Sequence, residues 1–168
     1  SKEKMKKFIV MLMLCAPMAV FAQQKFGHVN AQEILTSMPE YSIANGEIEA
    51  KAKEFQNEMQ EMQNEFQRKA EEYDKAKATM PQTKQQETEQ ELQNLYQKLQ
   101  MANQDYQQQL QKLQQEKQQP LYTKLMNAIA TVGKTGNYVY IMDIATALYT
   151  NDAISEDVTA KVKAELKK

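Results

Sequence analysis

The chain has 168 residues, of which 42% are hydrophobic and 26% are charged, and its formal net charge is −1. These averages are those of one ordinary soluble domain with a usable core. They conceal three successive segments of different character, which predict an export signal, a helical arm and a small body.

Residues 1–22 have the pattern of an export signal. Met5-Lys6-Lys7 precedes an apolar run that extends from Phe8 to Val20, and small side chains stand at the positions that a signal peptidase reads. We expect a cleavable signal peptide that ends at Ala22, with residues 1–4 as an upstream extension. A retained membrane anchor is the alternative, but the run is shorter than the roughly 20 apolar residues that cross a bilayer.

Removal of this signal changes the charge of the chain. The remaining 146 residues contain 17 basic and 21 acidic side chains. This acidic balance excludes a strongly basic surface of the kind that binds nucleic acids. The only cysteine, Cys15, lies in the signal and follows Leu14 rather than a small residue, so we expect neither lipoprotein processing nor a disulfide.

Residues 45–119 predict an antiparallel helical hairpin. Apolar residues recur from Ile48 onward at alternating spacings of three and four, which is the heptad pattern of a coiled coil. Pro39 marks the start of the first helix, which we expect to run to about Thr79, and residues 80–82 form the tip. The seam between the two helices is expected to contain Phe55, Met59, Met62, Phe66, Tyr73, Leu92, Leu95, Leu99, Tyr106 and Leu113.

Glutamine dominates the outside of this arm. It occupies twenty of the 67 positions from Lys53 to Gln119. Because glutamine is a good helix former, this bias indicates a polar and weakly charged solvated face. A disordered or aggregation-prone glutamine tract is the alternative, but apolar heptads interrupt it.

The two ends of the exported chain predict a small body with short strands. Residues 25–29, 137–142 and 147–150 are strand candidates, and a short helix follows the first of them. Glycines at 133 and 136 are expected to stop the second long helix. Ser155 is expected to cap a final amphipathic helix.

This body, residues 23–44 and 120–168, is too small to bury a large core alone, so we expect copies of the chain to complete it. The fold class is therefore mainly α with a small β-body (α+β). Pro120 stands where arm and body meet and is expected to kink the second helix. The residues expected to pack in the body or between copies are Phe26, Val29, Ile34, Leu35, Tyr138, Tyr140, Ile141 and Leu148.

The sequence contains no recognisable catalytic or metal-binding pattern. His28 is the only histidine, and no carboxylate stands at a recognisable spacing from it, so we expect a packed or surface imidazole. Asp143 is expected to form a turn or to pack in the body. With four glycines and no phosphate-binding loop, we expect no cofactor and no enzymatic activity.

Apolar residues that flank the heptad core, together with one residue at the tip, are the candidate binding surface. The flanking residues are Tyr96 and Leu110 at e positions and Met101, and the tip residue is Met80, which the turn leaves without a partner helix beyond Pro81. Methionine is flexible and polarizable, and tyrosine combines a large apolar body with a polar end, so both suit contacts with many partners. The alternative is that these side chains only widen the seam.

Seven short segments and the hairpin follow one another in a recognisable order. The segments are residues 26–30, 32–35, 38–41, 119–122, 136–143, 148–149 and 154–158. In this order they resemble the Skp/OmpH group of periplasmic chaperones. This resemblance implies a homotrimer with a small β-body and three helical tentacles, which enclose a cavity for unfolded outer-membrane proteins. It also implies ATP-independent holding and transfer to the outer-membrane assembly machinery.

The arm differs in charge from the basic members of this group. Residues 45–119 contain 10 basic and 14 acidic side chains. We therefore do not expect binding of membranes or lipopolysaccharide, and we expect client capture to depend on apolar and amide contacts. An exported coiled-coil scaffold or spacer in the cell envelope is the alternative function, although the reversal at Pro81 turns the rod back on itself.

Overall fold

The computed structural model describes residues 1–4 and 23–168, so the expected signal sequence lies almost entirely outside the described residues. The chain forms two compact units. We call Gln32–Met126 the hairpin unit, and Ser1–Ala31 together with Asn127–Lys168 the sheet unit. Among the described residues, no helix has the length and apolar character that a membrane crossing requires.

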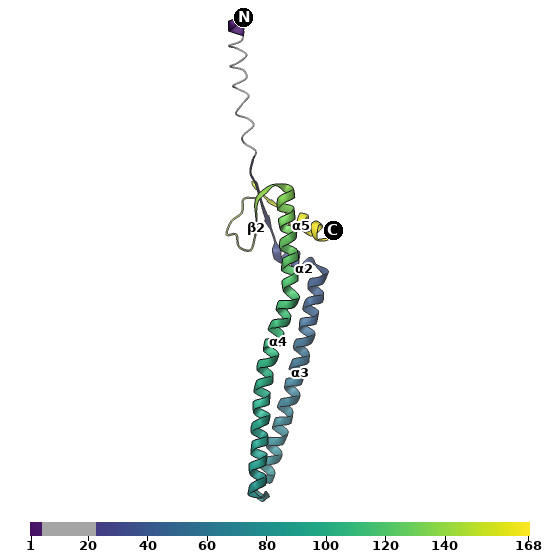
Figure 1. Cartoon of the computed structure of the whole chain (residues 1–168), viewed down its shortest axis with the longest axis vertical. Helices are drawn as coiled ribbons and strands as arrows, with labels where there is room; N and C mark the ends of the chain where they lie inside the picture. The colour runs from purple at the N-terminus through teal and green to yellow at the C-terminus, as the bar shows by residue number, and fades with distance from the viewer. Residues whose placement is uncertain (5–22) are drawn as a thin grey trace. The chain divides into compact units, whose positions relative to one another are not determined.

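Two long helices form the hairpin unit, as the heptad spacing predicts (Figure 1). Helix α3 spans Pro39–Ala76, with its proline in the first turn, and the short 3-10 helix η1 follows at Lys77–Thr79. Helix α4 begins at Gln82 and continues to Gly136 in the sheet unit. The reversal is closed by Gln85, whose Nε2 donates to the carbonyl oxygens of Lys77 at 2.7 Å and Met80 at 3.1 Å. This side chain satisfies carbonyl groups that the end of a helix leaves unpaired.

Aromatic contacts join the two helices. The rings of Phe55 and Tyr106 stack with centroids 4.2 Å apart and planes 6° apart, and Phe55 is buried. The Tyr106 hydroxyl also donates to Glu58 on the opposite helix. The other predicted seam residues are half-buried, as expected where each helix has a single neighbour.

The sheet unit contains three parallel strands in the order β2-β1-β3. They are β1 at Lys25–Val29, β2 at Tyr138–Asp143 and β3 at Ser155–Asp157. Because β1 lies in the centre, its residues His28 and Val29 are buried. Short helix α2 at Ala31–Ser37 follows β1, and α5 at Thr159–Leu166 ends the fold.

The third strand lies elsewhere than predicted. Residues 147–150 form neither helix nor strand, and Leu148 and Tyr149 are largely exposed. The free edge of β1 is taken instead by β3, and the Val158 amide continues this pairing by donating to the His28 carbonyl oxygen at 2.9 Å. Strand-forming residue types in 147–150 therefore did not decide the pairing.

The last helix also begins later than predicted. Ser155 lies in β3, and α5 begins at Thr159. The carboxylate of Asp157 accepts hydrogen bonds from the backbone amide and the hydroxyl of Thr159, at 3.0 and 2.6 Å. These two bonds, the hydroxyl bond first, lower the pKa of Asp157.

The end of helix α4 agrees with the expected glycine stops. Pro120 lies inside the helix, as expected of a proline that interrupts its regular path, and Gly133 lies within its last turns. The helix ends at Gly136, the second of the two expected stops. Asn137 follows with a positive φ of 56°, which asparagine tolerates better than most residues.

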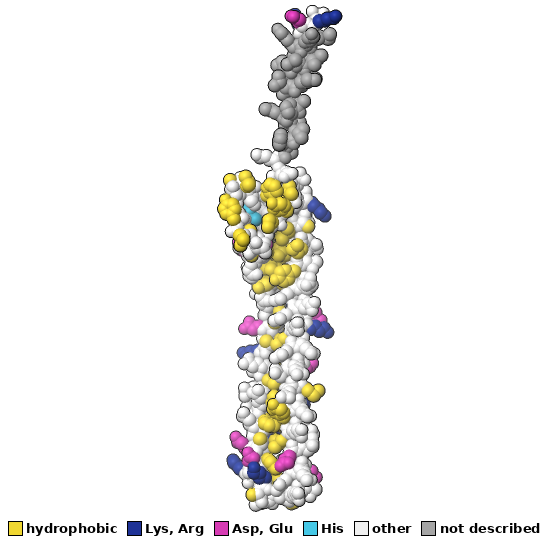
Figure 2. Space-filling model, turned by 90° about the vertical axis from the view of Figure 1, so that its left-hand side faces the viewer, with side chains coloured by type: hydrophobic (Ala, Val, Ile, Leu, Met, Phe, Trp, Pro, Cys, Tyr) yellow, Lys and Arg dark blue, Asp and Glu magenta, His cyan; other side chains and the backbone are white. Residues whose placement is uncertain are grey.

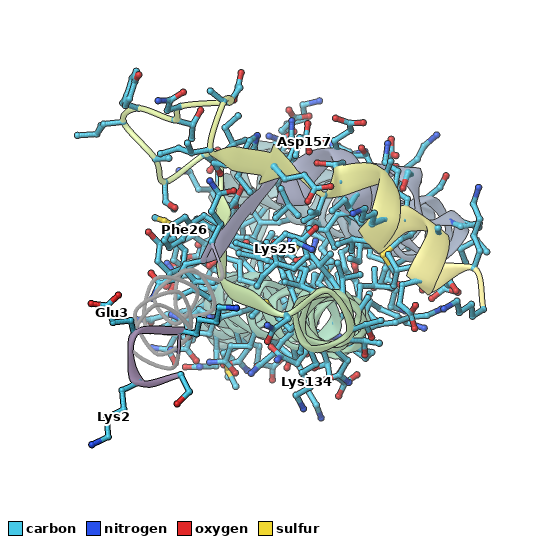
Figure 3. The ribbon with its side chains drawn as sticks, turned by 90° about the horizontal axis from the view of Figure 1, so that it is seen from above. Lys2, Glu3, Lys25, Phe26, Lys134 and Asp157 are labelled. Carbon is cyan, nitrogen blue, oxygen red and sulfur yellow. The ribbon has the colours of Figure 1, made fainter. Side chains whose placement is uncertain are left out.

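Tyr138 connects all the strands of the sheet unit. Its hydroxyl donates to Glu156 on β3, and the Lys161 amine lies 2.8 Å from the Glu156 carboxylate and 3.2 Å from the Tyr138 oxygen. Lys25 on β1 places its amine 4.7 Å from the centre of the tyrosine ring and donates to the Gly136 carbonyl oxygen at 2.9 Å. Figure 3 shows Lys25 and the neighbouring Phe26 on β1.

The groups of this cluster shift one another's pKa values. Hydrogen bonds from Lys161 and Tyr138 lower the pKa of Glu156, and hydrogen bonds to Glu156 and Tyr138 raise the pKa of Lys161. Burial, followed by the bond to Glu156, raises the pKa of Tyr138. All three shifts favour the protonation states that the groups have at neutral pH.

Two glycine substitutions are expected to change stability in opposite directions. Gly46→Ala should raise the free energy of unfolding by up to about 1 kcal/mol, because alanine favours helix and a Cβ there meets nothing within 4 Å. Gly136→Ala should lower it by about 1–3 kcal/mol, because the Cβ would lie 2.2 Å from the Tyr138 ring. Urea unfolding followed by circular dichroism measures both. Equal effects of the two substitutions would contradict the packing around Tyr138.

Glu156→Gln should reduce the sensitivity of the fold to acid. A lowered carboxylate pKa stabilises the fold above the ordinary value of 4.5, and this contribution is lost as the pH falls through the lower folded value. Tm should therefore fall less in the variant than in the unaltered chain between about pH 6 and about pH 3. The difference should be small because the cluster is largely exposed. Glu87→Gln in the hairpin unit is the control, and an equal change there would refute the role of Glu156.

Candidate functional site: exposed binding surfaces

The three candidate binding residues in the middle of the hairpin differ in their surroundings. Tyr96 is half exposed, and its ring lies 5.9 Å from that of Phe66 on the opposite helix, so it extends the seam. Leu110 is half-buried beside the seam. Met101 is 70% exposed and lies on the side of α4 that faces away from α3. Of the three, Met101 alone offers most of its side chain to a partner.

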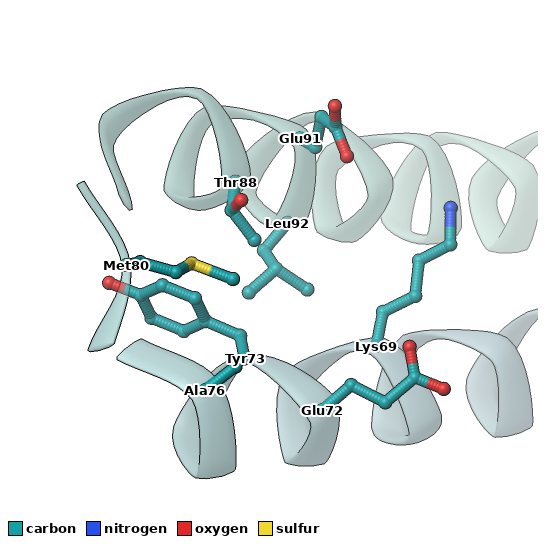
Figure 4. Close-up of a pocket in the computed structure, with 8 residues that line it drawn as sticks. All are labelled: Lys69, Glu72, Tyr73, Ala76, Met80, Thr88, Glu91 and Leu92. Atoms are coloured by element: carbon teal, nitrogen blue, oxygen red, sulfur yellow. The ribbon is translucent and has the colours of Figure 1, made fainter. Parts of the chain in front are cut away.

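The fourth candidate, Met80, lines a small pocket next to the tip. In Figure 4 the side chains of Tyr73, Met80 and Leu92 converge there, while Lys69 and Glu91 stand at the rim. The pocket has a volume of about 260 Å³, below the usual size of small-molecule sites and closer to that of one large side chain. Its full lining is Lys69, Glu72, Tyr73, Ala76, Met80, Thr88, Glu91 and Leu92.

Tyrosine–glutamate hydrogen bonds join the two helices at two positions along the hairpin. The Tyr73 hydroxyl donates to Glu89 near the tip, as Tyr106 does to Glu58 further along. In each pair the hydrogen bond to the carboxylate is the main cause that raises the pKa of the tyrosine. Both phenols therefore stay protonated and keep donating at neutral pH.

Other exposed apolar residues of the hairpin unit were not predicted. Ile43 on α3 is 62% exposed, and Tyr122 and Met126 on α4 are 50% and 61% exposed. Tyr122 and Met126 are one turn apart and each follows a buried leucine, Leu121 and Leu125. This repeated pair of a buried and an exposed apolar residue is the signal that identifies them.

A larger apolar set lies on the sheet unit, where Figure 2 shows hydrophobic side chains gathered around the histidine. Strand β2 is an edge of the sheet, and the segment that follows it carries further exposed apolar side chains. Monomeric soluble proteins seldom leave such a set uncovered, and edge strands are ready to pair with another chain. We call it the sheet-unit apolar set: Val139, Tyr140, Met142, Ile144, Leu148, Tyr149 and Ile154.

The predicted body residues divide between the interior and this surface. Val29, Ile34 and Leu35 are buried. Tyr138 and Ile141 are half-buried, as is Phe26, whose ring lies 5.0 Å from that of Tyr140. Tyr140 and Leu148 are exposed. Their exposure leaves them available for contact with another molecule.

His28 is packed within the sheet unit. It is 5% exposed, its Nδ1 lies 2.8 Å from the Ser155 hydroxyl, and its Nε2 lies 3.8 Å from Asp152. The order of these neighbours is the reverse of that in a Ser-His-Asp catalytic triad, where the serine faces Nε2. We interpret the contact with Ser155 as a tie between β1 and β3. The sequence did not predict Asp152 as a neighbour, because it lies far from His28 along the chain and no short spacing connects the two residues.

Asp143 forms a turn at the end of β2. Its carboxylate accepts from the backbone amide of Ala145 at 3.2 Å and from that of Ala31 at 3.4 Å. Across the part of the chain that the structure describes, no three His, Cys, Asp or Glu side chains are grouped so that they could hold a metal ion. The surfaces described above are thus the candidates for function.

Comparison with known proteins identifies the fold and the family. Residues 25–166 match the model of the family described as "Outer membrane protein (OmpH-like)". A crystal structure of an OmpH-like protein from Caulobacter crescentus CB15, described as a candidate outer membrane chaperone, has a TM-score of 0.73 and 18% sequence identity. That match covers 86% of this chain and 85% of the other. Comparison with curated proteins finds no match. The chain belongs to the OmpH-like outer membrane protein family.

Proposed function

We propose that this protein is an ATP-independent holdase of the periplasm, which binds unfolded outer-membrane β-barrel proteins and prevents their aggregation. The observation that carries this proposal is the exposure of large apolar side chains on the long hairpin: Ile43, Met101, Tyr122 and Met126. Membership in the OmpH-like family supports it, as does the chaperone description of the similar C. crescentus protein. The pattern of residues 5–22 supports export.

Holding requires many weak contacts rather than one tight site. An unfolded chain that binds loses conformational freedom, and this loss offsets part of the binding free energy. Each 100 Å² of apolar area removed from water contributes roughly 2.5 kcal/mol before that loss. Methionine and tyrosine side chains adapt to varied client sequences, so scattered contacts of this kind suit clients of different sequence.

We further propose that three copies of the chain assemble through the sheet-unit apolar set. Its residues lie on an edge strand and on the irregular segment after it, where a second chain can add backbone pairing and cover the apolar side chains. Three hairpins would then surround one client. Delivery of that client to the outer-membrane assembly machinery is part of the same proposal.

The mature protein should suppress aggregation of an unfolded outer-membrane β-barrel protein without nucleotide. Light scattering after dilution of the client from urea measures this. Suppression should saturate near one trimer per client, because binding is stoichiometric rather than catalytic. No suppression at a several-fold excess of trimer would refute the holdase. Equal binding of folded and unfolded envelope proteins would favour the scaffold alternative, because a scaffold does not discriminate by folding state.

Substitution of Tyr140 and Tyr149 by serine should shift the native mass from trimer toward monomer. Both side chains are exposed in a single chain, and their loss removes apolar area from the proposed contact between copies. Native mass spectrometry measures the change. Tyr122→Ser in the hairpin unit is the matched control and should leave the mass unaltered. A monomeric unaltered chain, or an unchanged mass in the double variant, would refute this assembly.

A further inference from the structure

The outward face of α4 carries no charge over seven turns of helix. Between Gln93 and Gln118, every position that faces away from the seam is an amide or Met101. Eleven of these twelve side chains are exposed and Gln118 is half-buried. We call them the amide face: Gln93, Asn94, Gln97, Gln100, Met101, Gln104, Gln107, Gln108, Gln111, Gln114, Gln115 and Gln118.

This absence of charge is specific to one side of one helix. The corresponding outward face of α3 carries charged residues, among them Lys53, Glu61 and Arg68. The charged residues of α4 in the same stretch lie beside or in the seam, where Lys117 pairs with Glu47 on α3 and Lys112 with Glu116. The hairpin thus carries charge elsewhere and lacks it on this face.

Helix formation does not account for the amide face. Lysine, glutamate and glutamine have similar helix propensities, and charged residues keep an exposed surface more soluble. A solvated face with no other task would be expected to mix charges with amides, as the outward face of α3 does. Ten glutamines in twelve positions therefore indicate a contact that charge would disturb.

Primary amides complement an unpaired polypeptide backbone. Each glutamine side chain offers both a donor and an acceptor, and an extended chain presents N–H and C=O groups that need both. Within the described residues, the side chains of Gln104, Gln108, Gln111 and Gln115 take part in no hydrogen bond, so they are available to a partner. Because the face is uncharged, no charged side chain of the face has to lose its water when a partner binds.

Apolar contacts lie within and beside the amide face. Met101 stands inside it, and Tyr122 is an exposed aromatic residue of the same helix beyond Pro120. Both side chains are at least half exposed, and Met126 lies one turn beyond Tyr122. A strand segment of an unfolded β-barrel alternates apolar and polar side chains along an extended backbone, so it matches a face that mixes amides with a few apolar residues.

We propose that the amide face binds the extended backbone of the unfolded client. This inference rests on the proposed holdase function and specifies its mode of recognition. The bound groups are peptide N–H and C=O groups, with Met101 and Tyr122 in contact with client side chains. Because no charge takes part, binding depends little on the charge of the client or on salt.

The test removes amides from each helix in turn in the full exported chain. The variant Gln104→Ala, Gln108→Ala, Gln111→Ala and Gln115→Ala alters the amide face and retains helix propensity. The matched control alters four amides on the outward face of α3: Asn57→Ala, Gln60→Ala, Asn64→Ala and Gln67→Ala. Fluorescence anisotropy measures Kd for a labelled outer-membrane β-barrel protein diluted from urea. Circular dichroism and native mass confirm that both variants fold and assemble.

We expect the α4 variant to bind about tenfold more weakly and the α3 control to change less than about twofold, because four amide contacts are lost only in the first. Equal Kd values for all three proteins would overturn the inference and leave the holdase intact. A changed native mass in the α4 variant would assign the face to contact between copies and overturn it also. If the unaltered chain does not bind the client, both proposals fail.

Salt provides an independent measurement on the unaltered chain. Kd should change less than about twofold between about 0.05 M and 0.5 M NaCl, since screening acts on charged contacts. A strong weakening by salt would show that charged side chains capture the client, and it would overturn recognition by amides.

Discussion

The seam of the hairpin is the constraint on which the hairpin unit depends. Each of its two helices has one helical neighbour, so a seam side chain is covered from one side only and most remain half-buried. Flat stacking of Phe55 on Tyr106 and the hydrogen bonds from Tyr73 and Tyr106 to glutamates compensate for this shallow burial. The outward faces of both helices are thereby left free. Their chemistry can vary without loss of the hairpin.

The sheet unit has a well-connected interior but an apolar exterior. Three short parallel strands hold a small interior around Val29, Val158 and Val162, and the cluster around Tyr138 ties the strands to α5. One edge of the sheet and the segment after β2 nevertheless expose the sheet-unit apolar set. A unit that is well tied internally but apolar outside is typical of a subunit that folds and then associates.

The sequence predicted the helices better than the sheet, because heptad spacing is a local signal. The third strand was misplaced to 147–150, since β1 pairs with residues more than a hundred positions away and no local signal identifies such a partner. Tyr122 and Met126 were missed for another reason. After Pro120 the buried positions of α4 become Leu121, Leu125, Ala128 and Val132, so the repeat that describes the arm no longer identifies which residues face outward.

The charge on the outward faces of the arm determines which kind of contact those faces can make with a partner. The contacts that join the two helices lie in the seam, so the side chains of the outward faces can be charged or amide-bearing without changing those contacts. A charged face captures clients of opposite charge at long range but weakens with salt. An amide face acts only at contact and does not depend on client charge. Under the proposed holdase function, a net acidic arm with an uncharged face on α4 corresponds to the second mode.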